Sequence, residues 1–490
     1  MPTTGGQFPH PDYARYVLAP GFHHAQAMLW PHMMAANEAH TLMLAEQGIV
    51  SKTDAAALLS AQREVIATGP EAFAYTPEVE DLFFLVEAKL IELAGPDAGG
   101  NLQIARSRND LAAVMCRMLI RQRLSEIEQT TLRLRARLIA LIEQHIDTLM
   151  PGITHTQPAQ PTTLAHYLLG VLGPLERDSD RLRQAWKRTN QSSLGVAAFT
   201  TTSFPIDRDL TAKLLGFDGY IENGYDAVGG ADHMLEATQA LVTMTASLSR
   251  FVQDLLIWAR SEVGILRVGD EFIQISSIMP QKRNPVVLEH IRTRIGYVYG
   301  DANTVATMIH GAAFGDTNDV EDPIYVPIAR AFDAAEMVLT LLTDVLETAE
   351  FNVALLADRA ADGYTTTTAL ADGLVRDFGL PFRVAHHITS QAVKSAGGGA
   401  ITAESVSAIA DNLLGHPIAV DASWLAEQLD PRRFVAMRAI PGGPAHSTVE
   451  RALVAARSRL AADEAAVAAA IAQVDAAASE RSDRIDRLVG

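Results

Sequence analysis

The chain has 490 residues, enough to bury a large apolar core and to form roughly two to four domains. Its 58 acidic residues outnumber the 40 basic ones, and the net charge of -18 disfavours nucleic acid as a partner because it repels polyphosphate. Hydrophobic residues make up 48% of the chain and aromatic residues only 6%, a composition typical of a globular, mainly helical enzyme rather than a disordered protein.

The cellular location is predicted from the cysteine content and the N-terminus. A single cysteine, Cys116, excludes an intrachain disulfide and fits a reducing compartment. The first ten residues, MPTTGGQFPH, have no basic patch followed by an apolar run, so no secretion signal is expected. No stretch approaches the roughly 18 uninterrupted apolar residues that span a bilayer. These features predict a cytoplasmic protein without a membrane partner.

The first 108 residues are expected to form a small helical domain. Apolar patterns at helical spacing cover residues 25–47 and 53–68, and Ser51 or Thr53 could cap the second helix. No proline or glycine then interrupts residues 109–149, where the helical spacing continues. One helix over this span would be about 60 Å long, which is too long for an ordinary compact domain.

Similar long patterns cover residues 231–263, 285–309 and 326–350. Helices of this length cannot cover their apolar stripes alone, so residues 109–360 are expected to form a central bundle that other subunits complete. Shorter segments, broken by glycine and proline, then predict a C-terminal helical domain over residues 361–490. An alanine-rich helix and a charged tail end this domain.

Three separate stretches combine hydroxyl, amide and cationic side chains with turn residues, namely residues 99–110, 150–161 and 276–292. Each adjoins the end of an expected long helix, where free backbone N–H groups can bind an anion. A local cluster of this kind is needed because the overall negative charge repels anionic substrates. Together the stretches indicate one composite anion site.

Taken singly, each stretch also has a purely structural explanation. Arg106 and Arg108 could be solvated residues at a helix start, and backbone groups could satisfy His155 in a turn. Ser276 could belong to a flexible loop or to a helix cap. The proline-containing loop that carries the polar residues 282–284 is harder to explain by solvation alone.

The third stretch carries the sharpest signal. Its sequence SSIMPQKRNPVVLE, from Ser276 to Glu289, resembles the signature loop of the fumarase/aspartase superfamily, and MPQKRNP has the form found in the argininosuccinate lyase branch. Other segments support the resemblance in the family's order: TSFPIDRDLTAKLLGFDG at 202–219, YDAV at 225–228, GYTTTTALADGLVRDFGLPFRVAH at 363–386 and GGPA at 442–445. The resemblance therefore spans most of the chain.

This resemblance implies an all-α, three-domain fumarase/aspartase-type fold whose central long helices form a twenty-helix core in a homotetramer. It also implies a carbon-nitrogen lyase that reversibly eliminates fumarate from an N-substituted L-aspartate through an aci-carboxylate intermediate. Each active site would form where the three stretches meet from three different subunits. We expect no cofactor and no metal, since the adjacent pairs His23–His24 and His386–His387 lack the spacing of metal ligands.

The catalytic roles that the resemblance implies fall on four residues. Ser276 matches the family's catalytic serine, which removes a proton from the carbon next to a carboxylate. Its hydroxyl is a poor base unless backbone N–H groups and Lys282 stabilise the alkoxide. His155 and Glu289 match the superfamily's His–Glu pair, in which the carboxylate orients the imidazole for proton handling near the leaving nitrogen.

Seven further residues are expected to bind the substrate: Ser107, Arg108, Asn109, Thr154, Ser277, Met279 and Asn284. Those of the first two stretches match residues that hydrogen-bond the succinyl carboxylates, with Arg108 beside them. Asn284, together with Lys282, would hold the carboxylate that becomes the aci-form, because donors arranged in advance stabilise the developing charge. Ser277 and Met279 lie in the loop that closes over the substrate and excludes water.

The chain departs from argininosuccinate lyases where those enzymes bind the amino-acid end of their substrate. Ala231 replaces an arginine, and Gly315, Val320 and Pro323 replace a tyrosine, a glutamine and a lysine. Ile275 also precedes the serine where the family usually has glycine. The succinyl half of the site is therefore kept while the amine half is rebuilt. This division resembles ethylenediamine-N,N'-disuccinate (EDDS) lyase and predicts an aminopolycarboxylate substrate.

Three alternatives stay open at this point. The chain could be an argininosuccinate lyase proper, which forms arginine and fumarate. It could instead be a carbon-oxygen hydro-lyase of the fumarase type. A non-catalytic structural homologue is disfavoured, because such a protein would have no need to retain the catalytic residues together.

Overall fold

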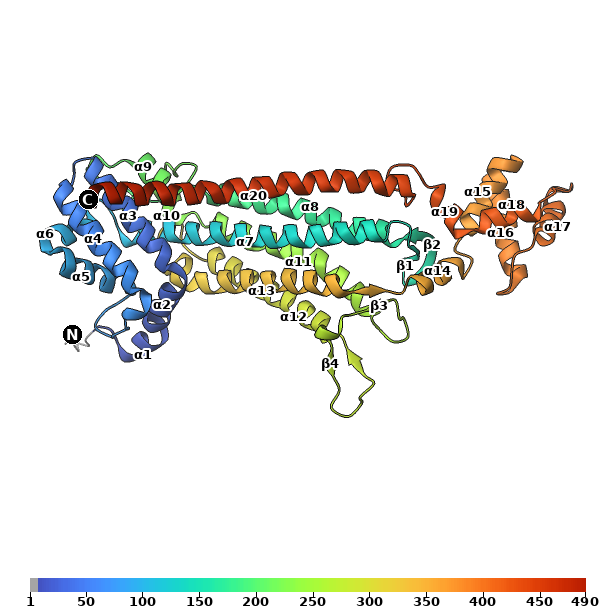
Figure 1. The fold of residues 1–490 in the computed structure, drawn as a ribbon, viewed down its shortest axis with the longest axis horizontal. Coiled ribbons are helices and arrows are strands. Elements are labelled where there is room, and N and C mark those ends of the chain that lie inside the picture. Colours follow the sequence, from blue (N-terminus) through green and yellow to red (C-terminus); the bar gives the residue numbers. More distant parts are fainter. Residues whose placement is uncertain (1–7) are drawn as a thin grey trace.

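The computed structural model describes residues 8–490, which form an elongated, all-α molecule with three regions in a row (Figure 1). A bundle of long helices fills the middle, and shorter helices lie at both ends (Figure 1). The prediction that no secretion signal is present rests in part on residues 1–7, which lie outside the described residues.

Short helices form the N-terminal region: α1 (Pro11–Tyr13), α2 (Ala19–His24), α3 (Trp30–Glu46), α4 (Lys52–Thr68), α5 (Leu82–Ala94) and α6 (Pro96–Gly99). Two π-helical turns, Ala14–Leu18 and Ala25–Leu29, join the first three. Ser51 caps α4, since its side chain accepts a hydrogen bond from the N–H of Asp54 at 3.1 Å. Of the two residues expected to cap this helix, Ser51 is therefore the one that does so.

Five long helices make up the central bundle: α7 (Arg108–Gln144), α8 (Leu164–Thr189), α11 (Asp232–Trp258), α12 (Val286–His310) and α13 (Asp322–Thr348). All but α8 correspond to the long patterns predicted from the sequence. Gly170, Gly173 and Pro174 lie inside α8, and these residues obscure its helical pattern. The 37 residues of α7 make it about 55 Å long.

Helix α11 belongs to the segment Gly224–Trp258, which by length and composition alone could cross a membrane. In the bundle, however, α11 packs against α8, α12 and α13. Leu241, Met244 and Leu248 are buried along it. Its apolar composition is therefore explained by its place among the bundle helices.

Three small pairs of antiparallel strands decorate the bundle: β1 (Leu149–Thr154) with β2 (Gln157–Thr163), β3 (Leu266–Arg267) with β6 (Glu350–Phe351), and β4 (Gln274–Ile275) with β5 (Arg283–Asn284). The β1–β2 hairpin follows α7 at the end of the bundle away from the N-terminal region, and the β4–β5 loop projects from its side (Figure 1). Two short helices, α9 (Arg208–Leu214) and α10 (Gly224–Gly229), lie near the start of α7 (Figure 1).

The far end of the molecule contains the helices α14 (Val353–Ala361), α15 (Thr367–Phe378), α16 (Phe382–Ala396), α17 (Ala403–Leu414), α18 (Ala422–Leu429) and α19 (Pro431–Ala436). Four of them, α15 to α18, enclose a hydrophobic cluster of their own that includes Leu370, Ile388 and Val406. The chain then turns back.

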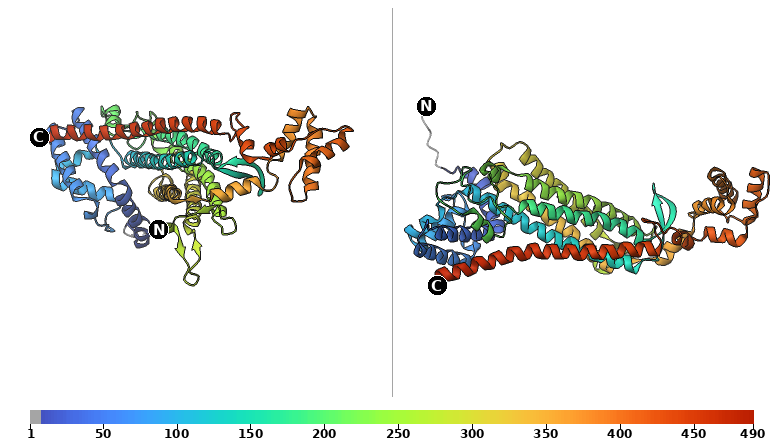
Figure 2. Two further views of the ribbon diagram at one scale, coloured as in Figure 1. Left: turned by 45° about the vertical axis from the view of Figure 1, so that its right-hand side comes forward. Right: turned by 90° about the horizontal axis from the view of Figure 1, so that it is seen from above.

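The last helix, α20 (His446–Val489), runs the length of the bundle and ends beside the N-terminal helices (Figure 2). It packs on α7 and α8 and reaches α3 and α4. The division into domains at residues 108 and 360 stays a prediction, and α20 is the part of the expected third domain that packs on the bundle. The expected charged tail continues this helix.

A buried network of ion pairs joins α20 to α7 and α8 of the bundle. Asp463 on α20 lies 2.5 Å from Arg135 on α7 and 2.7 Å from Arg183 on α8. Arg135 is fully buried and also donates to Ser179 at 2.9 Å. Arg183 in turn pairs with Glu128 at 3.0 Å, and burial raises the pKa of Glu128 to about 7.

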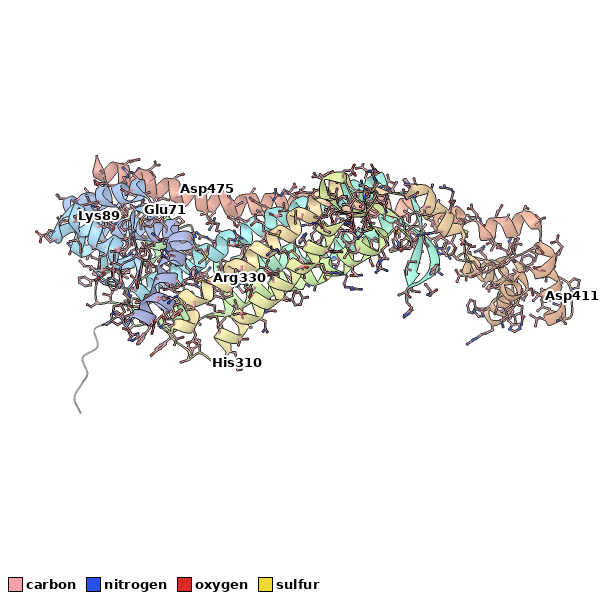
Figure 3. The ribbon with its side chains drawn as sticks, turned by 90° about the horizontal axis from the view of Figure 1, so that it is seen from below. Glu71, Lys89, His310, Arg330, Asp411 and Asp475 are labelled. Carbon is pink, nitrogen blue, oxygen red and sulfur yellow. The ribbon has the colours of Figure 1, made fainter. Side chains whose placement is uncertain are left out.

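Replacing Asp463 by alanine should destabilise the fold by about 3 kcal/mol, because it leaves the Arg135 guanidinium buried without its carboxylate. Urea unfolding of Asp463→Ala beside wild type measures the difference. Asp475, exposed on the same helix (Figure 3), provides the control, since Asp475→Ala should change stability by less than about 0.5 kcal/mol. Equal effects of the two substitutions would contradict the role of the network.

Candidate active site

The first predicted stretch forms the start of α7, where Asp110 holds the turn in place. The buried carboxylate of Asp110 accepts hydrogen bonds from the N–H groups of Ser107 (2.9 Å), Gly195 (2.9 Å) and Ala197 (3.0 Å). The Ser107 side chain accepts from the N–H of Asn109 at 3.3 Å. Burial raises the pKa of Asp110 to about 6, although the three N–H groups oppose the shift. The expected substrate-binding turn is thus a rigid, capped helix start.

Arg108 and Asn109 meet carboxylates within the protomer. Arg108 lies 2.7 Å from Asp81 and 3.3 Å from Glu80, and its guanidinium stands 4.9 Å from the ring centre of Phe84. The Asn109 side-chain amide donates a hydrogen bond to the carboxylate of Asp316. Both side chains are therefore oriented by neighbouring groups.

Asp316 belongs to a group of three carboxyl groups at the start of α13, together with Glu321 and Asp322. Burial raises the pKa of Glu321 to about 8, and the hydrogen bond and negative charge of Asp316 add to the shift. Burial, with the charge of Asp81, also raises the pKa of Asp322 to about 6. Asp316 was not predicted from the sequence, where residues 315–323 were noted only for the family side chains that they lack. An acidic residue next to the position of the lost tyrosine was a usable signal.

The second predicted stretch forms the β1–β2 hairpin. Thr154 pairs with Gln157, so His155 and Thr156 are the two turn residues. Both have positive φ values, 50° and 65°, which are uncommon for residues other than glycine. The turn leaves the His155 side chain exposed. A histidine held in such a turn fits a functional role better than a packing role.

The third predicted stretch forms the loop between β4 and β5 and the start of α12. The Ser276 hydroxyl oxygen accepts hydrogen bonds from the N–H of Met279 at 3.0 Å and of Ile278 at 3.4 Å. At the base of the loop, the Asn284 side chain donates to the carbonyl of Gln274 at 3.0 Å. The backbone of the loop thus directs two donors at the expected catalytic oxygen.

Two large apolar side chains on this loop are exposed. Ile275 is 85% exposed and Ile278 is 83% exposed. Isoleucine side chains are rarely this exposed on the surface of a monomeric globular protein. Ser277, Lys282 and Glu289 are also exposed. The loop is therefore suited to insertion into another surface.

One protomer does not bring the three stretches together. The turn at Ser107 and the hairpin at His155 lie beyond opposite ends of α7, and the Ser276 loop projects from the side of the bundle (Figure 1). Among residues 8–490, neither a hydrogen bond nor an ion pair joins His155 to Glu289. The composite site expected from the sequence would need more than one copy of the chain.

Two of the cavities in the described part of the chain are well defined, and the predicted site residues line neither of these two. The first, of about 380 Å³, is lined by Arg117, Gln184, Lys187, Arg188, Gln191, Ile221, Asp226, Asp232 and His233. The second, of about 420 Å³, is lined by Glu271, Phe272, Ile273, Gln274, Val286, Val287, His290, Arg294, Met337 and Leu341, and it adjoins the base of the Ser276 loop. Within residues 8–490 no three His, Cys, Asp or Glu side chains are grouped as metal ligands would be. The absence of a metal stays a prediction.

Comparison with protein families matches residues 23–300 to a family described as lyase, and residues 364–436 to the argininosuccinate lyase C-terminal family. Argininosuccinate lyase 1 of Shouchella clausii is 36% identical over 439 residues, which cover 89% of this chain and 88% of that protein. Argininosuccinate lyase of Methanocorpusculum labreanum is 38% identical over 431 residues, which cover 87% of this chain and 86% of that protein.

Solved structures of EDDS lyase resemble the whole chain. The complex with formate has a TM-score of 0.86 and 30% identity, and covers 99% of this chain and 97% of its own. A variant of EDDS lyase with bound fumarate gives the same TM-score at 29% identity, again covering 99% of this chain and 97% of that one. A 3-carboxy-cis,cis-muconate lactonizing enzyme from Pseudomonas putida shares the fold at a TM-score of 0.70 and 20% identity, covering 91% of this chain and 99% of its own.

The raised pKa of Glu321 predicts a pH-dependent stability. A carboxyl group whose pKa is higher in the folded chain favours folding most below its ordinary pKa of 4.5, and this contribution is lost as the pH rises to about 8. Glu321→Gln should therefore match wild type near pH 4.5 and exceed its stability near pH 9, as measured by thermal unfolding. Glu71→Gln, at an exposed position (Figure 3), is the control and should follow wild type at both values. If Glu321→Gln were less stable than wild type near pH 9, other groups would compensate the charge of the buried Glu321 carboxylate, and the prediction would be wrong.

Proposed function

The chain belongs to the argininosuccinate lyase branch of the fumarase/aspartase superfamily, as a carbon-nitrogen lyase that releases fumarate, and we propose that it acts on an N-substituted L-aspartate of the aminopolycarboxylate type, such as EDDS. The observation that carries the assignment of the base is the pair of backbone N–H groups directed at the Ser276 hydroxyl oxygen. The similarity to EDDS lyase over the whole chain supports the choice of substrate.

The elimination is a proton transfer followed by bond cleavage. Ser276 removes a proton from the succinyl carbon that neighbours the C–N carbon, and the electron pair passes into the adjacent carboxylate to give the aci-form. When this pair returns, the C=C bond of fumarate forms, the C–N bond breaks, and the nitrogen leaves with the bonding electrons and a proton. The two N–H groups at Ser276 Oγ stabilise the alkoxide that makes serine a competent base.

Donors from all three stretches hold the substrate in this proposal. Lys282 and Asn284 stabilise the double negative charge of the aci-carboxylate. Ser107, Asn109 and Thr154 bind the succinyl carboxylates, with Arg108 beside them. His155, oriented by Glu289, handles the proton at the leaving nitrogen. Ser277 and Met279 enclose the substrate as the loop closes and excludes water.

A homotetramer is proposed as the active assembly. The separation of Ser107 from His155 along α7 supports it, because one protomer cannot place both at one substrate. The exposed Ile275 and Ile278 on the Ser276 loop also support it, since contact with another copy would cover them. A cytoplasmic location and the three-domain division belong to the same proposal.

The amine half of the site favours a substrate other than argininosuccinate. Val320 is buried in the core, and Ala231 is buried at the start of α11, so neither position offers a polar group to an amino acid. Gly315 has no side chain, and a Cβ atom added there would lie 3.9 Å from the Tyr225 ring. A carboxylate, Asp316, accepts a hydrogen bond from Asn109 beside this position. Argininosuccinate itself remains the alternative, because the similar curated proteins are argininosuccinate lyases.

Complementation between inactive variants tests the shared site. Ser276→Ala and His155→Ala should each lose elimination by about 1,000-fold, since one removes the base and the other the proton-handling group. After subunit exchange, mixed tetramers should regain part of the activity, because some sites then combine intact stretches from different copies. Mixing Ser276→Ala with Lys282→Ala gives no such gain, as both changes affect the same stretch. Mixtures that stay inactive despite demonstrated exchange would refute the shared site.

Substrate preference tests the amine half. We expect kcat/KM for EDDS to exceed that for argininosuccinate by on the order of 100-fold, because each missing polar partner in a closed site costs about 1 to 3 kcal/mol. The appearance of fumarate, followed by its ultraviolet absorbance, measures both reactions in the same assay. A preference for argininosuccinate would assign the chain to arginine formation instead.

A further inference from the structure

We propose that the cavity of about 380 Å³ between the C-terminal end of α8 and the start of α11 is a second ligand site, which binds a small α-amino acid in its zwitterionic form. The volume of this cavity lies in the range of small-molecule binding sites in proteins. None of the expected active-site residues lines it. The inference is therefore independent of the substrate proposed above.

Two of the side chains that line the cavity are buried. Arg117 on α7 is 3% exposed, and His233 on α11 is 4% exposed. Within residues 8–490, the Arg117 Nε atom has no hydrogen-bond partner, and its Nη1 atom donates to the Arg188 carbonyl at the long distance of 3.5 Å. Neither ring nitrogen of His233 has a partner in hydrogen-bonding geometry, although the backbone of Gly230 lies near the ring. Buried polar atoms are normally satisfied, so we expect a group inside the cavity to pair with these.

The buried part of the lining carries one positive charge. Burial lowers the pKa of the Arg117 guanidinium, and the negative charges of Asp232 and Asp226 oppose this shift. A guanidinium stays protonated in proteins. Burial, together with the charge of Arg117, lowers the pKa of His233 well below its usual 6.5. The imidazole is therefore neutral and offers one donor and one acceptor.

Exposed side chains of both signs complete the lining. Lys187 on α8, Asp226 on α10 and Asp232 on α11 all border the cavity and are exposed. In the part of the chain that the structure describes, none of these three side chains forms an ion pair, and neither does Arg117. The cavity thus brings together two cations and two carboxylates whose charges are not neutralised by direct contacts within the protein.

The carboxylate of Asp226 is held in place by the turn between α10 and α11. A Cβ atom placed on Gly230 would lie 2.9 Å from Oδ1 of Asp226, so this carboxylate packs closely against the turn. Asn223 caps α10 and accepts hydrogen bonds from the N–H groups of residues 225 and 226. Groups positioned before a ligand arrives lower the cost of binding it.

A zwitterion matches both signs of charge in this lining. Its carboxylate can pair with Arg117 and Lys187, and its ammonium group can pair with Asp226 and Asp232. A simple anion would be repelled by the two aspartates, and a simple amine would leave the buried guanidinium without a carboxylate. Ile221 adds an apolar side chain to the lining, which suits a short aliphatic side chain on the amino acid.

This site is separate from the expected substrate site, although α7 contributes to both. Arg117 follows Asn109 by eight residues, a distance of about 12 Å along the helix axis and a rotation of about 80° around it. Asn109 donates to Asp316, whereas Arg117 borders the cavity with residues of α8, α10 and α11. A bound amino acid would therefore connect four helices of the protomer without occupying the substrate-binding turn.

Calorimetric titration of the full-length protein with L-valine, in the absence of fumarate, tests the site without turnover. Wild type should bind L-valine at least about tenfold more tightly than 3-methylbutanoate, which lacks the ammonium group, or isobutylamine, which lacks the carboxylate. Lys187→Gln and Asp232→Asn, both at exposed positions, should each weaken binding by about tenfold. The matched controls are Lys52→Gln on α4 and Asp411→Asn on α17 (Figure 3), which are exposed elsewhere and should bind as wild type does.

Asn109→Ala distinguishes this site from the active site. The substitution alters the expected substrate-binding turn and should leave the binding of L-valine unchanged. If Asn109→Ala abolished binding while Lys187→Gln and Asp232→Asn retained it, the amino acid would lie in the active site and the proposal would be overturned. Binding of 3-methylbutanoate as tight as that of L-valine would refute a zwitterionic ligand. A wild-type protein that binds no L-valine, as expected of a cavity that holds only water, would refute the site itself.

Discussion

The length of α7 is the constraint on which the proposed site depends. Its 37 residues form a rigid rod between the turn at Ser107 and the hairpin at His155, and a helix cannot fold back on itself to bring its two ends together. Residues that the proposed site requires at one substrate are therefore held apart in the protomer. In the proposed tetramer, copies of the chain would bring these groups together again, so the rod that separates them in one protomer is what makes assembly necessary.

The Ser276 loop shows how local structure can prepare a group for chemistry before any partner arrives. The N–H groups of Ile278 and Met279 at the tip of the loop already point at the serine oxygen. The pairing of β4 with β5 and the hydrogen bond of Asn284 fix the other end of the loop, where it joins the bundle. The donors that would stabilise the proposed catalytic alkoxide thus come from one chain, whereas binding of the substrate carboxylates would depend on the proposed assembly. This division suits an enzyme whose base must not act on water or on other metabolites while the site is open.

Much of this architecture was predictable because it depends on local sequence patterns. The uninterrupted spacing after residue 109 predicts α7, and the short loop motif from Ser276 to Glu289 predicts the family. Helix α8 was not predictable in the same way, since its internal glycines and proline are tolerated only through packing against α7 and α11. The pairing of Asn109 with Asp316 and the cavity between α8 and α11 join segments far apart in the chain. Such contacts are decided by tertiary structure, which one sequence does not reveal.

The return of α20 along the bundle has a consequence for how the protein is made. Near its end, Arg481 lies 2.9 Å from Glu38 on α3, and Leu488 packs against the main core, so the last residues complete the packing of the first helices. During synthesis the N-terminal helices emerge long before these partners exist. Until α20 leaves the ribosome, the surface that it covers is exposed to solvent and to other nascent chains, so the N-terminal region completes its packing only after the bundle and the helices at its far end have been synthesised.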